Sequence, residues 1–125
     1  MDYLKQIEEL FGPAQKGAAH GLASSSVEIP GFYLYSVFRS GELIYVGITK
    51  QLGKRFYIHL KDRIEDTDDV YFWERDSIEH ARISEAVAIN VFLPLLNEYI
   101  PRLELFTETF GEMLKIAQTT KENMR

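Results

Sequence analysis

The sequence predicts an α+β fold: a small mixed or antiparallel three-stranded sheet flanked by helices, in ββαβα order, with an extra helix at each end. Three observations lead to this prediction. Two β-rich runs flank a glycine-containing turn, a short aromatic run further along has the length of a buried strand, and a later segment has the apolar spacing of a helix. At 125 residues the chain fits one domain with its own core.

The first thirty residues predict one short helix and then a flexible segment. Asp2 can cap the helix, which ends at Gly12-Pro13. The small and polar residues from 13 to 30 are typical of a loop or mobile segment. We therefore treat residues 1–30 as an N-terminal addition to the domain.

Residues 31–97 predict the core of the domain. Its expected elements are strands at 32–38 and 43–48, a helix at 52–62, a buried strand at 70–74 and a long helix at 77–92. Asp76 followed by Glu79 has capping-box-like spacing at the start of the long helix, and Pro94 ends it. Residues 98–125 predict a helical extension, with an amphipathic helix at about 104–118 that packs on the same core.

Charge is unevenly distributed along the chain. The net charge of −5 argues weakly against nucleic acid as a partner. Residues 31–63, however, carry six basic and two acidic side chains, net +4, whereas residues 64–125 carry six basic and thirteen acidic side chains, net −7. Local potential steers a polyanion, so the basic segment can face DNA, unless the clustering arose by chance.

Composition also narrows the class of protein. The chain has no cysteine, which excludes disulfides and thiolate metal sites. Its start, MDYLKQIEEL, lacks the basic region and apolar stretch of a signal peptide. No apolar run approaches the roughly 18 residues of a membrane span. We expect a cytoplasmic protein without membrane contact.

Three polar residues on predicted helices are candidates for chemistry. Glu85 lies on a mostly apolar stripe of the long helix, where a carboxylate needs a cation or a metal ion. Arg82, one turn earlier, offers an intrahelical ion pair as the simpler alternative. Arg55 and His59 lie four residues apart and share a helix face, which by itself is typical of a solvated basic surface.

Other residues that could carry chemistry are expected to have packing, turn or surface roles. Tyr35, Tyr57, Tyr71 and Trp73 are interpreted as packing residues, and His20 and His80 as a loop residue and an exposed helix residue. Asn97 follows the long helix and could be a turn residue.

The spacing of these residues resembles the GIY-YIG nuclease family. Two tripeptides are similar to those of the family: Gly-Phe-Tyr at 31–33 and Tyr-Val-Gly at 45–47, with eleven residues between them. Arg55 comes ten residues after Tyr45, and His59 four residues further on, at the positions of the catalytic arginine and of a His or Tyr in the family.

The resemblance continues to the end of the predicted core. The family pattern closes with a glutamate, a proline and an asparagine. This chain has a similar series in Glu85, Pro94 and Asn97, with Asn97 twelve residues after the glutamate. Several positions in register are far more specific than either tripeptide alone. The resemblance thus covers about residues 31–97.

The resemblance implies a divalent-metal-dependent endonuclease that hydrolyses DNA phosphodiester bonds. Glu85 would be the single protein ligand of one Mg²⁺ or Mn²⁺ ion, and Arg55 would stabilise the charge of the transition state. Tyr33 or Tyr45 would position or deprotonate the attacking water. The implied catalytic residues are Tyr33, Tyr45, Arg55, His59, Glu85 and Asn97, with Lys50, Lys54 and Lys61 as candidates for DNA contact.

A shared site requires both tyrosines to lie on one face of the hairpin. A two-residue turn at Ser40-Gly41 would place Tyr33 and Tyr45 on opposite faces, whereas a three-residue loop at 39–41 would place them on the same face. We therefore predict the three-residue loop, with positive φ at Gly41.

This predicted register also assigns a role to a glycine. Tyr45 would pair with Tyr35, and Tyr33 with Gly47, whose missing side chain would leave room for the Tyr33 ring. On the other face, Phe32, Leu34, Ser36 and Phe38 would pack on the core.

The sequence leaves a second function open. Where the DNA-repair branch of the family has a lysine three residues after the second tyrosine, this chain has Ile48. The alternative is therefore a catalytically inactive module of the same fold that binds nucleic acid or inhibits a partner protein. The acidic C-terminal half suggests such a partner, or a homodimer.

Overall fold

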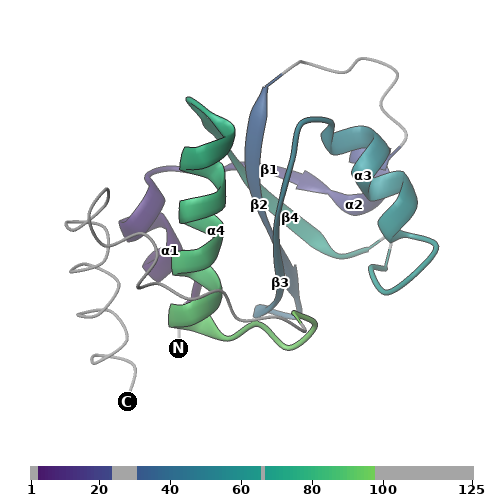
Figure 1. The fold of residues 1–125 in the computed structure, drawn as a ribbon. Helices are drawn as coiled ribbons and strands as arrows, with labels where there is room; N and C mark the ends of the chain where they lie inside the picture. The colour runs from purple at the N-terminus through teal and green to yellow at the C-terminus, as the bar shows by residue number, and fades with distance from the viewer. Residues whose placement is uncertain (1–2, 24–30, 66, 98–125) are drawn as a thin grey trace.

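The computed structural model describes residues 3–23, 31–65 and 67–97, which form four helices and one antiparallel sheet of four strands. The elements are α1 (Tyr3–Phe11), β1 (Gln15–Ala18), α2 (Ala19–Ala23), β2 (Phe32–Arg39), β3 (Glu42–Thr49), α3 (Leu52–His59), β4 (Asp69–Arg75) and α4 (Ile78–Phe92). The strands lie in the order β1-β4-β2-β3, with the long helix α4 on one side of the sheet and α3 on the other (Figure 1). The α+β prediction is confirmed.

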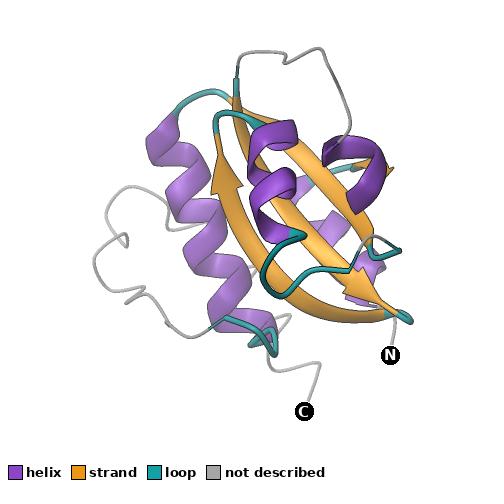
Figure 2. Ribbon diagram, turned by 90° about the vertical axis from the view of Figure 1, so that its right-hand side faces the viewer, coloured by secondary structure: helices purple, strands orange, loops and turns teal. Residues whose placement is uncertain are grey.

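The hairpin of β2 and β3 combines a two-residue turn with a β-bulge. Ser40 and Gly41 have φ values of 53° and 79°, the left-handed conformation that tight hairpin turns require at both central positions. The register shifts after Val37, which faces Tyr45, so that Ile44 is an extra residue in β3. The long strands run side by side with a pronounced twist (Figure 2).

The predicted three-residue hairpin loop is therefore wrong, although the positive φ at Gly41 is confirmed. The bulge supplies the extra residue that the loop was expected to supply, so Tyr33, Tyr35 and Tyr45 still share one face of the sheet. The predicted partner of Gly47 is also wrong, because Gly47 faces Tyr35 and Tyr33 faces Thr49. A Cβ atom at Gly47 would lie only 2.6 Å from Cζ of Tyr35, so the glycine makes room for that ring.

The sheet has one strand more than the sequence predicted. β4 was expected as a buried strand, and it lies inside the sheet between β2 and β1. β1 pairs antiparallel with β4, with Gln15 opposite Phe72 and Ala18 opposite Asp69, where the sequence predicted a loop. The short strand is mostly exposed and contains a glycine, so its formation depends on backbone pairing with β4 rather than on a hydrophobic pattern.

The sheet separates two clusters of buried side chains, which we call the α4-side core and the α3-side core. The α4-side core consists of Ile7, Phe11, Leu34, Phe38, Leu43, Val46, Trp73, Ile83, Val87, Ala88, Ile89, Val91 and Phe92. The α3-side core consists of Ala19, Tyr33, Tyr35, Val37, Ile44, Leu52, Phe56, Ile64 and Val70. Alternate residues of β2 therefore point to different cores, as the period of a strand requires.

The ends of α4 are fixed by local contacts. The Ser77 hydroxyl accepts a hydrogen bond from the backbone N–H of His80 at 3.0 Å, so the cap lies one residue later than the predicted Asp76. Leu93, with φ of 48°, ends the helix just before Pro94. The chain then returns to β3, where Leu96 N–H donates to the carbonyl of Ile44 at 2.8 Å.

A partly buried ion pair between Arg39 and Asp68 stabilises the turn end of the hairpin. Arg39 donates from Nε and Nη2 to the two carboxylate oxygens of Asp68 at 2.9 and 2.8 Å, and the Asp68 side chain is only 1% exposed. Arg39 Nη2 also donates to the carbonyl oxygen of Arg63, in the connection between α3 and β4. This fork thereby joins β2 to the segment that follows α3.

Some sequence-based predictions lie outside the described residues, including the Asp2 cap and the C-terminal helix at about 104–118. In the described part of the chain, no helix is both long enough and apolar enough to cross a bilayer.

Candidate active site

The centre of the site is a chain of hydrogen bonds from α3 to β2. Arg55 Nε donates to the Tyr35 hydroxyl at 3.2 Å, and the same hydroxyl lies 2.7 Å from His59 Nε2. Arg55 and His59 are one helical turn apart on α3, and Phe56 beside them packs edge-on against the Tyr35 ring at 5.1 Å between centroids. The buried stripe of α3 thus holds both polar residues over the tyrosine face of the sheet.

The protonation states follow from burial and from these partners. Burial raises the pKa of Tyr35 well above its usual range, against the opposing effect of Arg55. Burial, together with the nearby charges of Arg55 and Arg63, lowers the pKa of His59 to about 4. Tyr35 is therefore a neutral phenol that accepts from Arg55 and shares a hydrogen bond with Nε2 of a neutral His59.

Tyr45 lies on the solvent side of this arrangement. Its ring stacks on Tyr35 with centroids 6.0 Å apart and meets His59 edge-on at 5.1 Å. The Tyr45 hydroxyl interacts with both Tyr35 and Arg55, and the side chain is half-buried rather than fully buried. Of the two tyrosines that interact with Arg55, Tyr45 is the one that is partly exposed to solvent.

Glu85, on α4, is partly buried and is influenced by the charge of Arg55. The nearby positive charges that lower its pKa are Arg55 first and Arg82 second, while burial acts more strongly in the opposite direction and raises it. Within the described residues, no hydrogen bond reaches the Glu85 carboxylate and no ion pair joins it at 4.0 Å or less. The intrahelical pair with Arg82, the simpler sequence-based alternative, is therefore not formed.

Asn97 has a positioning role. Its side-chain amide pairs twice with the backbone of Val46: Nδ2 donates to the carbonyl, and Oδ1 accepts from the N–H, both at 2.9 Å. Val46 follows Tyr45 in β3, the outer strand of the described sheet. Asn97 thereby holds the strand that carries Tyr45, and it is not a free turn residue.

Two tyrosines have surroundings that the sequence did not specify. Tyr33 lies in the α3-side core, with its ring edge-on to Phe72 at 6.2 Å, and it is only 7% exposed. Tyr35, expected to be a packing residue, instead bonds to both Arg55 and His59. Sequence reasoning missed this because a strand face filled with tyrosines has the same pattern whether the hydroxyls bond or only the rings pack.

The predicted lysines lie around the site on exposed positions. Lys50 follows β3, and its ammonium lies 5.5 Å from the centroid of the Phe32 ring. Lys54 is exposed on α3, and Lys61, just after the helix, lies 4.2 Å from the centroid of Tyr57. Lys54 and Lys61 thus accompany Arg55 on and just after α3.

Few of the described side chains are placed to bind a metal ion together. Among the described residues, no group of three or more histidine and carboxylate side chains is placed to hold an ion. Glu85 is a desolvated carboxylate without a hydrogen-bond partner in that part of the chain, which is the type of ligand that a hard divalent cation takes together with water. The residues therefore fit a site with one protein ligand.

Comparison of the chain with protein-family models, with curated proteins and with solved structures finds no match.

Proposed function

We propose that this protein is a divalent-metal-dependent endonuclease that hydrolyses DNA phosphodiester bonds, with the architecture of the GIY-YIG family. One observation carries the proposal: Arg55 on α3 interacts with Tyr45 of β3 and lies close enough to Glu85 on α4 for its charge to lower the pKa of that carboxyl. The motif spacing implied this grouping, and the packing of either helix alone does not require it. The site also combines the three group types that phosphodiester hydrolysis uses: a cation, a metal-binding carboxylate and a residue that can orient water.

Arg55 is the proposed stabiliser of the charge that develops on the phosphate. Its Nε is held by the Tyr35 hydroxyl, which fixes the plane of the guanidinium and leaves other N–H donors for a phosphate oxygen. Interaction with Tyr35 raises the pKa of Arg55 further, so the side chain stays cationic. His59, in turn, fixes the direction of the Tyr35 hydroxyl.

Tyr45 is the proposed residue that orients the attacking water. It is the tyrosine at the accessible side of the site, and its hydroxyl interacts with Arg55. Tyr35 is unsuited to act as a base, because burial raises its pKa. Tyr33 supports the site through packing in the α3-side core.

Glu85 is the proposed ligand of one Mg²⁺ or Mn²⁺ ion. Such an ion would polarise the phosphate and make bound water more acidic. The chain contributes the carboxylate and, through Arg55, a positive charge that opposes the rise in the pKa of Glu85 caused by burial.

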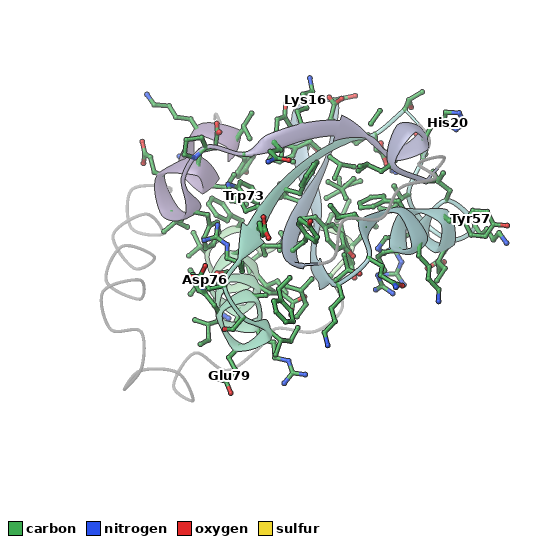
Figure 3. The ribbon with its side chains drawn as sticks, turned by 90° about the horizontal axis from the view of Figure 1, so that it is seen from above. Lys16, His20, Tyr57, Trp73, Asp76 and Glu79 are labelled. Carbon is green, nitrogen blue, oxygen red and sulfur yellow. The ribbon has the colours of Figure 1, made fainter. Side chains whose placement is uncertain are left out.

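The first test is cleavage of supercoiled plasmid and labelled branched DNA with Mg²⁺ or Mn²⁺. Glu85→Gln and Arg55→Ala should each reduce the rate by about 100-fold or more, since each removes a charge that acts in the transition state. Glu79→Gln is the matched control, because Glu79 is an exposed carboxylate on the same helix, at the edge of the molecule in Figure 3. Equal rates for the wild type and both site variants would refute the proposal.

The rival function is a catalytically inactive module of the same fold that binds nucleic acid or inhibits a partner protein. One observation favours it: Ile48, where the repair branch of the family has lysine, packs against the α4-side core and offers no charge to a phosphate. The same experiment separates the two functions. A folded wild type that cuts no substrate, with partner binding indifferent to Glu85→Gln, would favour the rival.

A further inference from the structure

The outward face of α3 combines exposed apolar side chains with lysines. Tyr57 is 56% exposed and Ile58 is 49% exposed, among the largest exposed hydrophobic side chains in the described residues. Lys54 lies one turn before them and Lys61 one turn after, and both are exposed. These four positions follow helical spacing, so they form one surface, which we call the α3 outer face.

Tyr57 is the prominent feature of this surface. Its side chain projects outward from the molecule (Figure 3), and the Lys61 ammonium lies 4.2 Å from its ring centroid. A lysine over one face of the ring restrains the ring and leaves more than half of the side chain in solvent. A restrained, exposed aromatic ring next to cations is the arrangement on which an unpaired base stacks.

The charges of this surface favour a polyanion. The α3 outer face carries Lys54 and Lys61, and Arg55 lies on the adjoining face of the same helix. The nearest exposed carboxylate, Asp62, is paired with Arg63 at 3.0 Å and is therefore partly neutralised. Two ammonium groups and a guanidinium on and just after one helix favour a phosphate backbone, with its regular negative charges, over a protein partner of ordinary composition.

We propose, on the basis of the proposed nuclease function, that the substrate is DNA with an unpaired strand, and that this strand crosses the α3 outer face with a base stacked on Tyr57. A duplex presents phosphates and sugars to a convex helix and buries its base faces, so it gives Tyr57 and Ile58 nothing apolar to contact. An unpaired strand exposes both its phosphates and its base faces. The helix that presents Arg55 to the scissile phosphate thus also holds the neighbouring nucleotides.

Binding without metal tests this surface separately from cleavage. We would measure the fluorescence anisotropy of a labelled oligothymidine and of a blunt duplex of equal length, in EDTA, with the full chain. Tyr57→Ala should weaken binding of the single strand by roughly tenfold or more, Tyr57→Phe should retain it, and the duplex should bind more weakly than the strand. Lys16→Ala is the matched control, because Lys16 also lies over a tyrosine ring, that of Tyr71, at 5.7 Å but on the α4 side.

Each outcome decides between the alternatives. Equal binding of the strand by the wild type and Tyr57→Ala, or duplex binding as tight as strand binding, would overturn the proposal. A change in oligomeric state on Tyr57→Ala with unchanged DNA binding would also overturn it, since protein would then cover this face.

Cleavage with Mg²⁺ or Mn²⁺ then separates this proposal from the function it rests on. Equal cutting of a branched substrate with an unpaired strand by the wild type and Tyr57→Ala would support the nuclease and overturn the strand-binding surface. Strand binding that depends on Tyr57, without cutting of any substrate, would support the surface and overturn the nuclease.

Discussion

Acidification should destabilise the protein through His59. The native state holds His59 neutral down to a pKa of about 4, whereas the unfolded chain protonates it near 6.5. Between these two values the unfolded state binds more protons, so the free energy of unfolding falls as the pH falls. The full difference corresponds to about 3 kcal/mol, and we expect about 2 kcal/mol because solvent screens the nearby charges.

The assay is urea unfolding at a series of pH values from neutral to mildly acidic, followed by the fluorescence of Trp73, the single tryptophan of the chain. His59→Gln removes the titrating group and keeps a side chain that can accept a hydrogen bond from Tyr35. On acidification, the free energy of unfolding of the wild type should therefore fall by about 2 kcal/mol more than that of the variant. His80, whose pKa burial also lowers, contributes to both proteins alike and cancels in the difference. Two curves that stay parallel would refute the buried, neutral His59.

Two further substitutions test the packing around the site. Gly47→Ala should destabilise the protein by about 1–3 kcal/mol in the same assay, because the new methyl group would press on the Tyr35 ring. Gly21→Ala is the control, because a Cβ atom at Gly21 would lie in open space and should not destabilise the protein. Equal effects of the two substitutions would contradict the close approach of Gly47 to Tyr35. Arg39→Ala should cost about 1–3 kcal/mol, since it leaves the buried Asp68 without its cation while the N–H of Glu65 still donates to it. A loss below about 1 kcal/mol, as for an exposed pair, would show that Asp68 is not desolvated.

Part of the fold could be predicted because its signals are local. The hairpin, the inner strand β4 and the long helix α4 each have a hydrophobic period that matches their structure. β1 has no such signal: the residues Gln15–Ala18 are mostly exposed and become a strand only because β4 offers them an edge. A strand that depends on its partner cannot be recognised from its own composition.

The hairpin shows a different limit of sequence reasoning. The requirement that Tyr33 and Tyr45 share a face gave the correct parity, but two backbone solutions satisfy it, a longer loop or a bulge. Ser40 adopts a positive φ, which is uncommon outside glycine, and so allowed the shorter turn. The requirement that both tyrosines lie on one face of the hairpin cannot by itself distinguish a longer loop from a bulge.

The roles of the candidate site residues depend on tertiary packing. Arg55 and Glu85 come from helices on opposite sides of the sheet, and the charge of Arg55 acts to lower the pKa of Glu85. Tyr35 was missed because its function depends on where its hydroxyl points, which is set by the register with Gly47 and by the position of α3. Such information lies in tertiary packing and not in the spacing of residues along the chain.

The clamp by Asn97 has a consequence for how copies of this protein meet one another. β3 is the outer strand of the described sheet, and an outer strand with unpaired backbone groups is a template on which a second chain can add its own strand. The Asn97 amide occupies both backbone groups of Val46 and so blocks the middle of that edge. The residue that holds the strand of Tyr45 thus also obstructs edge-to-edge pairing of this strand with a second chain.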